Sequence, residues 1–323
     1  MPQVSETTTI GRGVARPLMR ILGGVLLVLT FAGAVPAKRF YWEVVETYGE
    51  RGRGRNELRE PVDVAVLPEG RVVVLDRRRD AIVTFSRSGR WIRTLGGPRG
   101  GGELRLRDPV RIETDPRGRL WVVDRGDHRV VALDEDGREL VSIGTLGSDK
   151  GRFRYPVDIA FDERGRIYVA DYGNERVQVF TPDGRFLSQW RRRSANRRGH
   201  LGKPVLIAYT RESEGGVWVL SEGWTRLERF DRAGEWQDSL DLGQWLDAGE
   251  PVADLDLEPA FHRLFVSLPG SKRILVVDRR GRQIGELKGP ESGFEPWGLT
   301  VLRGMEVYVT DRAGRRVLRY RVR

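Results

Sequence analysis

A repeat with a period of 45 to 48 residues constrains the fold of this 323-residue chain more than any other feature. Six Pro-Val or Pro-Trp pairs, whose prolines stand at positions 61, 109, 156, 204, 251 and 296, each open an alternating apolar segment. A second apolar segment follows each pair, and in four repeats it ends in an aspartate: Asp76, Asp124, Asp171 and Asp311. The chain is therefore expected to contain six copies of one supersecondary unit.

Glycine-containing turn signals divide each repeat into four short segments that favour β-strands. In the third repeat the predicted strands are 156–162, 166–171, 176–181 and 186–190. Four antiparallel strands in such a unit are typical of a propeller blade. The sixth repeat holds only three strands, and the segment 40–50 supplies a fourth. The predicted fold is thus all-β: a six-bladed β-propeller of four-stranded antiparallel blades, closed by an N-terminal strand that completes the last blade.

Three segments carry a resemblance to a known family. Residues 162–190 (DERGRIYVADYGNERVQVFTPDGRFLSQW), 147–161 and 124–140 closely resemble the NHL repeat. The resemblance implies the same six-bladed propeller, but it does not select a function. Members of that family include RNA-binding domains, protein-interaction platforms and an amidating lyase with a three-histidine metal site.

The N-terminal segment predicts export. Arg12, Arg16 and Arg20 precede an uncharged run from Ile21 to Val35, and small residues follow it. We interpret residues 1–37 as a signal peptide or membrane anchor and residues 38–323 as the propeller. Either reading places the propeller outside the cytoplasm, as a periplasmic or extracellular domain or anchored to the outer side of the inner membrane. An uncleaved segment would also give the protein a membrane contact.

The formal net charge is +10, and the positive charge concentrates in loops that share one face of the predicted ring. Such a balance favours anionic partners. The residues predicted to form a basic, aromatic binding face are Arg105, Arg107, Arg152, Arg154, Tyr172, Arg191, Arg192, Arg193 and Trp224. The first hypothesis is therefore a non-enzymatic scaffold that binds an acidic protein or an anionic envelope polymer. Nucleic acid is an alternative partner only if residues 1–37 do not direct export.

Charged residues on the predicted inner strands suggest a second location. Asp63, Arg111, Asp158 and Asp254 should converge at the mouth of the central channel. One interpretation is the centre of a propeller hydrolase or lyase, with calcium held as in lactonase-type propellers. The other is an Asp–Arg network that only stabilises the ring. Both stay open at this point.

The remaining motifs favour structural roles. The chain has no cysteine, and its histidines, at 128, 200 and 262, are divided between the two faces, which disfavours a three-histidine metal site. We expect His128 and the recurring aspartates to stabilise turns. The arginines five residues beyond the second segment are expected to join neighbouring blades: Arg129, Arg176, Arg226, Arg273 and Arg316. No catalytic motif and no further cofactor is predicted.

Overall fold

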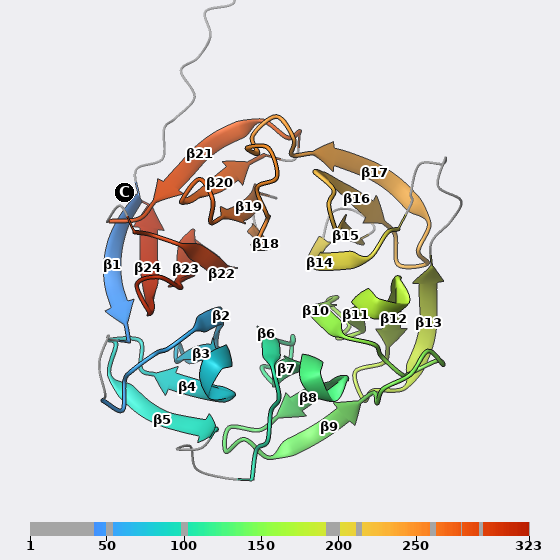
Figure 1. Cartoon of the computed structure of the whole chain (residues 1–323), viewed down its shortest axis with the longest axis horizontal. Coiled ribbons are helices and arrows are strands. Elements are labelled where there is room, and N and C mark those ends of the chain that lie inside the picture. The colour runs from blue at the N-terminus through green and yellow to red at the C-terminus, as the bar shows by residue number, and fades with distance from the viewer. Residues whose placement is uncertain are drawn as a thin grey trace, which may run out of the picture. The chain divides into compact units, whose positions relative to one another are not determined.

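A computed structural model describes residues 42–49, 54–97, 103–191, 201–210, 215–258, 263–278, 280–290 and 293–322. These residues form six four-stranded antiparallel sheets arranged in a ring around a channel (Figure 1). In blades 1 to 5 the strands run outward in chain order, because short hairpin turns connect neighbours. The observed strands of blade 3 begin and end within one residue of those predicted. The fold class expected from the repeat is confirmed.

The blades contain the following strands. Blade 1 is β2 (Pro61–Val66), β3 (Val72–Asp76), β4 (Ala81–Phe85) and β5 (Trp91–Gly96); blade 2 is β6 (Pro109–Thr114), β7 (Leu120–Asp124), β8 (Arg129–Leu133) and β9 (Glu139–Ile143); blade 3 is β10 (Pro156–Phe161), β11 (Ile167–Asp171), β12 (Arg176–Phe180) and β13 (Phe186–Arg191). Blade 4 is β14 (Pro204–Thr210), β15 (Gly216–Ser221), β16 (Arg226–Phe230) and β17 (Trp236–Asp241); blade 5 is β18 (Asp254–Glu258), β19 (Arg263–Leu268), β20 (Arg273–Val277) and β21 (Gln283–Lys288); blade 6 is β22 (Pro296–Leu302), β23 (Glu306–Asp311), β24 (Arg316–Val322) and β1 (Trp42–Tyr48).

The two ends of the described chain close the ring. Strand β1 pairs antiparallel with β24, so the order in blade 6 is β1-β24-β23-β22. This pairing covers an edge that β24 would otherwise expose. The predicted leader, residues 1–37, lies outside the described residues. Within the described part of the chain, no helix is long and apolar enough to cross a membrane.

The core consists of six apolar clusters, one at each interface between neighbouring blades. Because successive side chains of a strand point to opposite faces, one strand supplies two interfaces. In β3, Val73 and Leu75 pack toward blade 2, whereas Val72 and Val74 pack toward blade 6. Each fully buried Val or Leu contributes about 1.5–3 kcal/mol. The β-branched strands of the sequence therefore serve both as strand formers and as contacts between blades.

The recurring aspartates fix one face of the ring, which we call the upper face. It carries the loops that lead into the inner strands and the turns between second and third strands, among them η1 (Arg77–Arg79), η2 (Arg125–Asp127) and η3 (Tyr172–Asn174). The carboxylate of Asp171 accepts the backbone N–H of Arg154 at 2.8 Å and the Nε–H of Arg176 at 2.7 Å. Asp124 and Asp311 repeat this arrangement with Arg129 and Arg316.

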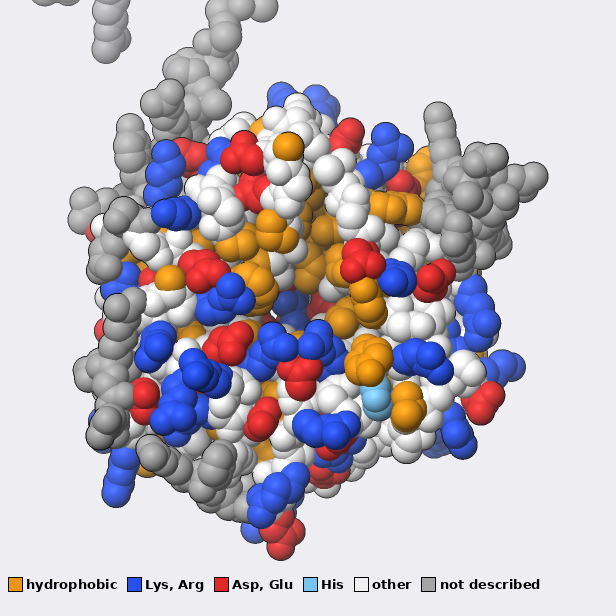
Figure 2. Space-filling view, in the orientation of Figure 1, with side chains coloured by type: hydrophobic (Ala, Val, Ile, Leu, Met, Phe, Trp, Pro, Cys, Tyr) orange, Lys and Arg blue, Asp and Glu red, His pale blue; other side chains and the backbone are white. Residues whose placement is uncertain are grey.

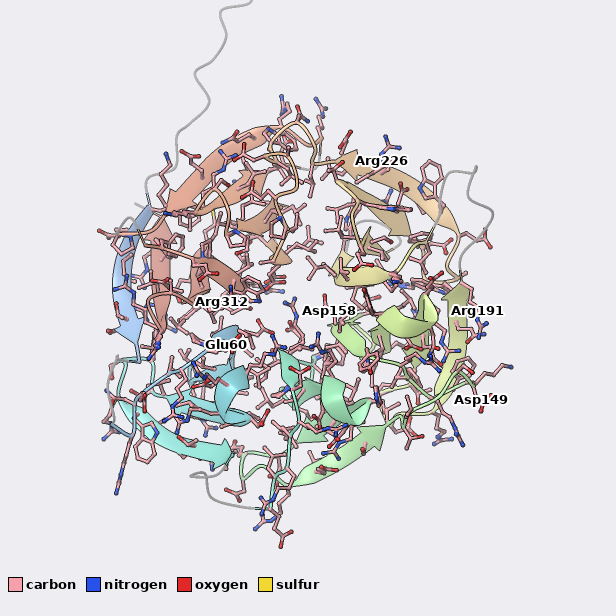
Figure 3. The ribbon with its side chains drawn as sticks, in the orientation of Figure 1. Glu60, Asp149, Asp158, Arg191, Arg226 and Arg312 are labelled. Carbon is pink, nitrogen blue, oxygen red and sulfur yellow. The ribbon has the colours of Figure 1, made fainter. Side chains whose placement is uncertain are left out.

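These hydrogen bonds correct one expectation. Arg176 binds the aspartate and the lead-in loop carbonyls of its own blade, so it ties one blade together and does not join two. Arg129 and Arg316 bind the aspartate of their own blade in the same way. Arg273 instead contacts Ser271 and the carbonyl of Trp245, and Arg226 is exposed at the outer part of blade 4 (Figure 3). The aspartates accept backbone N–H groups mainly from the lead-in loop of their blade, and Asp311 also accepts the N–H of Gly314 in the turn that follows it.

Candidate functional site

The structure brings the four predicted channel residues together around Arg111. Its Nε lies 2.8 Å from Asp158 Oδ1 and 3.5 Å from Asp63 Oδ2, and its Nη1 donates to Asp254 Oδ1 at 2.5 Å. All four residues are buried, and Asp158 projects from β10 toward the channel (Figure 3). Three blades thus present one carboxylate each to a single guanidinium group from a fourth.

Each of these aspartates also joins two blades through backbone hydrogen bonds. Asp158 accepts the N–H of Ile159 at 2.8 Å and, with its other oxygen, the N–H of Ile207 in blade 4 at 2.7 Å. Asp63 binds blade 2 and Asp254 binds blade 6 in the same way. A register shift after the opening proline in blades 1 and 3 turns the aspartate inward. Hence these residues stabilise the ring itself.

Burial dominates the titration of this cluster. It raises the pKa values of Asp63 and Asp254, and it raises that of Asp158 to about 7, although the charge of Arg111 acts in the opposite direction. The carboxylate oxygens already accept backbone N–H groups or contact Arg111, which disfavours a calcium site. Across the described residues, no group of three or more His, Cys, Asp or Glu side chains is arranged to hold a metal ion.

A funnel leads from the upper face to this cluster. Its cavity, about 140 Å³, has Arg111 and Asp158 at its base, and Arg125 also lines it. The walls come largely from the residues next to the opening prolines: Val62, Val110, Val157, Val205, Leu206, Ala253 and Trp297. Figure 2 views the ring from this side and shows hydrophobic side chains around a central hollow, with many Lys and Arg side chains on the surrounding blades.

The residue before each opening proline divides the funnel rim into two sectors. In blades 1, 2, 5 and 6 it is an acid, and three of these acids contact arginines: Glu60 with Arg77, Asp108 with Arg77 and Arg125, and Glu295 with Arg312. The fourth, Glu250, accepts the N–H of Ser271. In blades 3 and 4 the position holds Tyr155 and Lys203 instead. At the position before the proline, four blades therefore carry an acid, in three of them paired with arginine, and blades 3 and 4 carry none.

The predicted basic residues follow the same division. In blade 2, Arg107 pairs with Asp127 at 3.0 Å and Arg105 binds the carbonyl of Leu104. In blade 3, Arg152 approaches Asp149 at 3.8 Å, whereas exposed Arg154 and Arg191 have no acidic partner among the described residues. Arg191 lies at the outer rim of its blade, away from the channel (Figure 3). Arg192 and Arg193 lie outside the described residues, as do His200 and His262.

Two aromatic residues of the predicted face lie in blades 3 and 4. The hydroxyl of Tyr172 donates to Glu222 at 2.7 Å, and the Nζ of Lys203 lies 5.2 Å from the centre of the Tyr172 ring. Glu222 also pairs with Lys203 at 3.5 Å. Trp224 is partly buried against the apolar cluster between blades 4 and 5. These residues form a polar and aromatic rim, in which Glu222 offsets the charge of Lys203.

Tyr155 adds a further exposed ring beside Arg154. It is 51% exposed and has a φ of 53°, a left-handed conformation that is unusual for a bulky residue. His128 Nδ1 accepts the backbone N–H of Tyr155 at 3.0 Å, and the two rings meet edge to face at 4.7 Å. Burial and the charge of Arg107 lower the pKa of His128. His128 therefore positions Tyr155.

Sequence reasoning overlooked a second pair of acids deeper in the channel. Glu113 in β6 and Asp256 in β18 lie two residues beyond Arg111 and Asp254, on the same inner strands. The period of two along a strand places them on the same channel wall as those residues. That alternation was a usable signal, whereas the predicted channel residues all stand within three residues of an opening proline.

The fold and the channel define the class of this protein as a six-bladed β-propeller. Residues 153–180 match the family described as NHL repeat, so blade 3 is an NHL repeat from the end of its lead-in loop to its third strand. No curated protein sequence matches the chain significantly.

Solved structures resemble the whole ring. A virginiamycin B lyase from Staphylococcus aureus has a TM-score of 0.62 at 14% identity, covering 87% of this chain and 99% of that one. A gluconolactonase from Xanthomonas campestris has a TM-score of 0.61 at 13% identity, with coverage of 87% and 99%. A streptogramin B lyase reaches 0.56 at 16% identity, with 88% of each chain covered. At such low identity these similarities show the fold alone.

Proposed function

We propose that this protein is a non-enzymatic binding propeller, outside the cytoplasm, whose upper face engages an acidic protein or an anionic envelope polymer. The observation that carries the proposal is the segment Arg154-Tyr155-Pro156-Val157. Arg154 has an exposed guanidinium group without an acidic partner among the described residues. Tyr155 has an exposed ring and a strained backbone conformation, and Val157 lines the funnel. Such a combination suits a partner that offers a carboxylate or similar anion beside an apolar group.

The equivalent segment of blade 2 supplies a matched control. Arg107 occupies the position of Arg154, but it pairs with Asp127, and the next residue is the acid Asp108. Removing Arg107 should release Asp127 without removing an available cation. Removing Arg154 should weaken attraction for an anionic partner directly.

The experiment measures binding of the purified protein to fluorescently labelled poly-glutamate across a salt series. We expect log affinity to fall linearly with log salt, since each neutralised charge releases counterions. Arg154→Ala should weaken binding several-fold and flatten this dependence, whereas Arg107→Ala should change both by less than about twofold. Equal effects of the two variants, or no binding at low salt, would remove the upper face as the working surface.

A hydrolase or lyase centred on Asp63, Arg111, Asp158 and Asp254 is the alternative. The overall similarity to lyases and to a gluconolactonase gives it some support. The geometry favours it less, because these carboxylates are already engaged by backbone N–H groups and by Arg111. Calcium at the channel mouth stays a prediction, which elemental analysis of chelator-treated and untreated protein tests.

A further inference from the structure

A larger cavity opens at the other end of the channel, on the face opposite the funnel. We call it the lower cavity; its volume is about 380 Å³, within the range of small-molecule sites. Glu113 of blade 2 and Asp256 of blade 5 line it from opposite sides of the six-bladed ring. Other residues that line it include Thr114, Thr210, Thr300, Phe161, Tyr209 and Leu257.

The two carboxylates of this cavity form no ion pair with a described residue, although the charge of Arg111 acts to lower both of their pKa values. Glu113 accepts the N–H of Thr114 at 3.1 Å, and Asp256 accepts the N–H groups of Leu257 and Val301 at 2.7 Å. Neither forms an ion pair with a described residue, whereas the neighbouring cluster has Arg111. Burial and the charge of Asp256 raise the pKa of Glu113 to about 8, and burial raises that of Asp256 to about 7. An ionised carboxylate without such a partner is costly to bury.

Arg111 provides an independent observation at the inner end of the cavity. Its side chain is only 9% exposed and lines both the funnel and the lower cavity. Its Nε is buried and makes no hydrogen bond, although it lies 2.8 Å from Asp158 Oδ1 in an ion pair. A buried guanidinium group with an unused donor favours an acceptor atom nearby.

The surrounding charges limit what that acceptor belongs to. Three aspartates already surround Arg111, so a second anion there would be repelled. The arrangement of carboxylates also does not match a metal site among the described residues. Buried Glu258 adds a further acid to the lining, and exposed Arg303 is a cation at the rim, where solvent screens it. The interior therefore favours a positive group together with a neutral oxygen.

We infer that the lower cavity binds a small organic cation, an amine or guanidinium compound that also carries a carbonyl or hydroxyl oxygen. Glu113 and Asp256 hold the cationic group, and the neutral oxygen accepts from Arg111. This site is separate from the upper face and does not depend on the function proposed for it.

The test compares two probes of nearly the same shape by isothermal titration calorimetry on the purified protein at pH 7. N-acetylargininamide carries a guanidinium group and carbonyl oxygens, whereas N-acetylcitrullinamide replaces the guanidinium group by neutral urea. We expect the arginine probe to bind at least tenfold more tightly than the citrulline probe. Repeating the titration in two buffers should show proton release, because a bound cation favours ionised Glu113.

Variants place the binding in the cavity. Glu113→Gln should weaken the arginine probe at least tenfold and abolish most of the proton release. Glu135→Gln removes the same charge from an exposed turn, with a side chain 72% exposed, and should leave both unchanged. Thermal unfolding verifies that each variant is folded, and Asp256→Asn serves as a second cavity variant.

Four results would overturn the inference: no binding of the arginine probe, equal binding of the two probes, equal loss in Glu113→Gln and Glu135→Gln, or displacement of the arginine probe by calcium alone at micromolar concentration. The last result would identify a divalent metal site. None of these outcomes bears on polyanion binding at the upper face.

Discussion

The channel contains two layers of buried acids that the same inner strands build differently. In the upper layer, Asp63, Asp158 and Asp254 surround Arg111. In the lower layer, Glu113 and Asp256 have no arginine or lysine partner among the described residues, although they lie only two residues further along β6 and β18. The spacing along a strand thus places acids in both layers, but a partner is present in only one.

This difference separates stabilisation from ligand recognition. In the upper layer each aspartate joins two blades and contacts the central arginine, so most of its hydrogen-bonding capacity is used inside the protein. In the lower layer Asp256 also joins β18 to β22, but neither acid forms an ion pair with a described residue, and a cavity adjoins both. A cationic ligand in the adjoining cavity would stabilise the ionised form of these two buried acids.

Removing the central arginine tests the upper layer most severely. Arg111→Met leaves three buried carboxylates without their cation, so the free energy of unfolding at pH 8 should fall by about 3–5 kcal/mol. Urea denaturation measures it. Arg78→Met, at an exposed position on η1, should change stability by no more than about 0.5 kcal/mol. A loss below about 1 kcal/mol in Arg111→Met would mean that the upper layer is not held by its ion pairs.

A change at one aspartate should cost less. Asp158→Asn keeps the shape but has a single acceptor oxygen, so Ile159 or Ile207 loses its partner and the ion pair with Arg111 is broken. We expect a destabilisation of about 1–3 kcal/mol. Asp149→Asn, whose side chain is 79% exposed, is the control. Polyanion binding by the folded variant should match that of the unchanged protein, and its loss would instead connect the channel to the upper face.

The repeat made the fold predictable, because a period of 45 to 48 residues with four strands in each unit fits a propeller. Asp63, Arg111 and Asp158 occupy equivalent positions in the repeat, so the sequence alone predicted that they lie close together. Asp254 was harder, since it stands three residues after Pro251, whereas the others stand two residues after their prolines. The inner strand of every blade lines the channel. The prediction that Asp254 lies near the other three residues was therefore correct despite its offset of one residue.

Side-chain pairing was not predictable from the same repeat. Arg107 and Arg154 occupy equivalent positions and were predicted to share a function, yet Arg107 meets Asp127 and Arg154 meets no described acid. The difference depends on the third residue after the second strand, which is the acid Asp127 in blade 2 and the neutral Asn174 in blade 3. Burial differs equally sharply within one loop: Phe153, the residue before exposed Arg154, is fully buried between blades 2 and 3.

The pH dependence of stability distinguishes the layers further. Glu113, Asp158 and Asp256 have folded pKa values of about 7 to 8, above their ordinary values near 4, so the folded state binds more protons than the unfolded state. Their contribution to stability is therefore complete below about pH 4, the ordinary pKa of these groups, and is lost progressively as the pH rises from there to about 7 to 8. Each group contributes a slope of up to about 1.4 kcal/mol per pH unit. Urea denaturation between pH 6 and pH 9 should show this decline; a flat profile would contradict it.

The variant Glu113→Gln measures how much Glu113 of the lower layer contributes to the decline of the free energy of unfolding with rising pH. Glutamine resembles protonated glutamate, so the variant should match the unchanged protein at about pH 4, where this glutamate is protonated in both the folded and the unfolded state. At pH 9 it should be more stable by at least about 1 kcal/mol, because the unchanged protein then buries a charge. Glu135→Gln should follow the unchanged protein at both pH values, since its side chain is mostly exposed. If Glu113→Gln is instead destabilised at pH 9, a partner inside the protein already compensates the carboxylate, and the two layers do not differ as described.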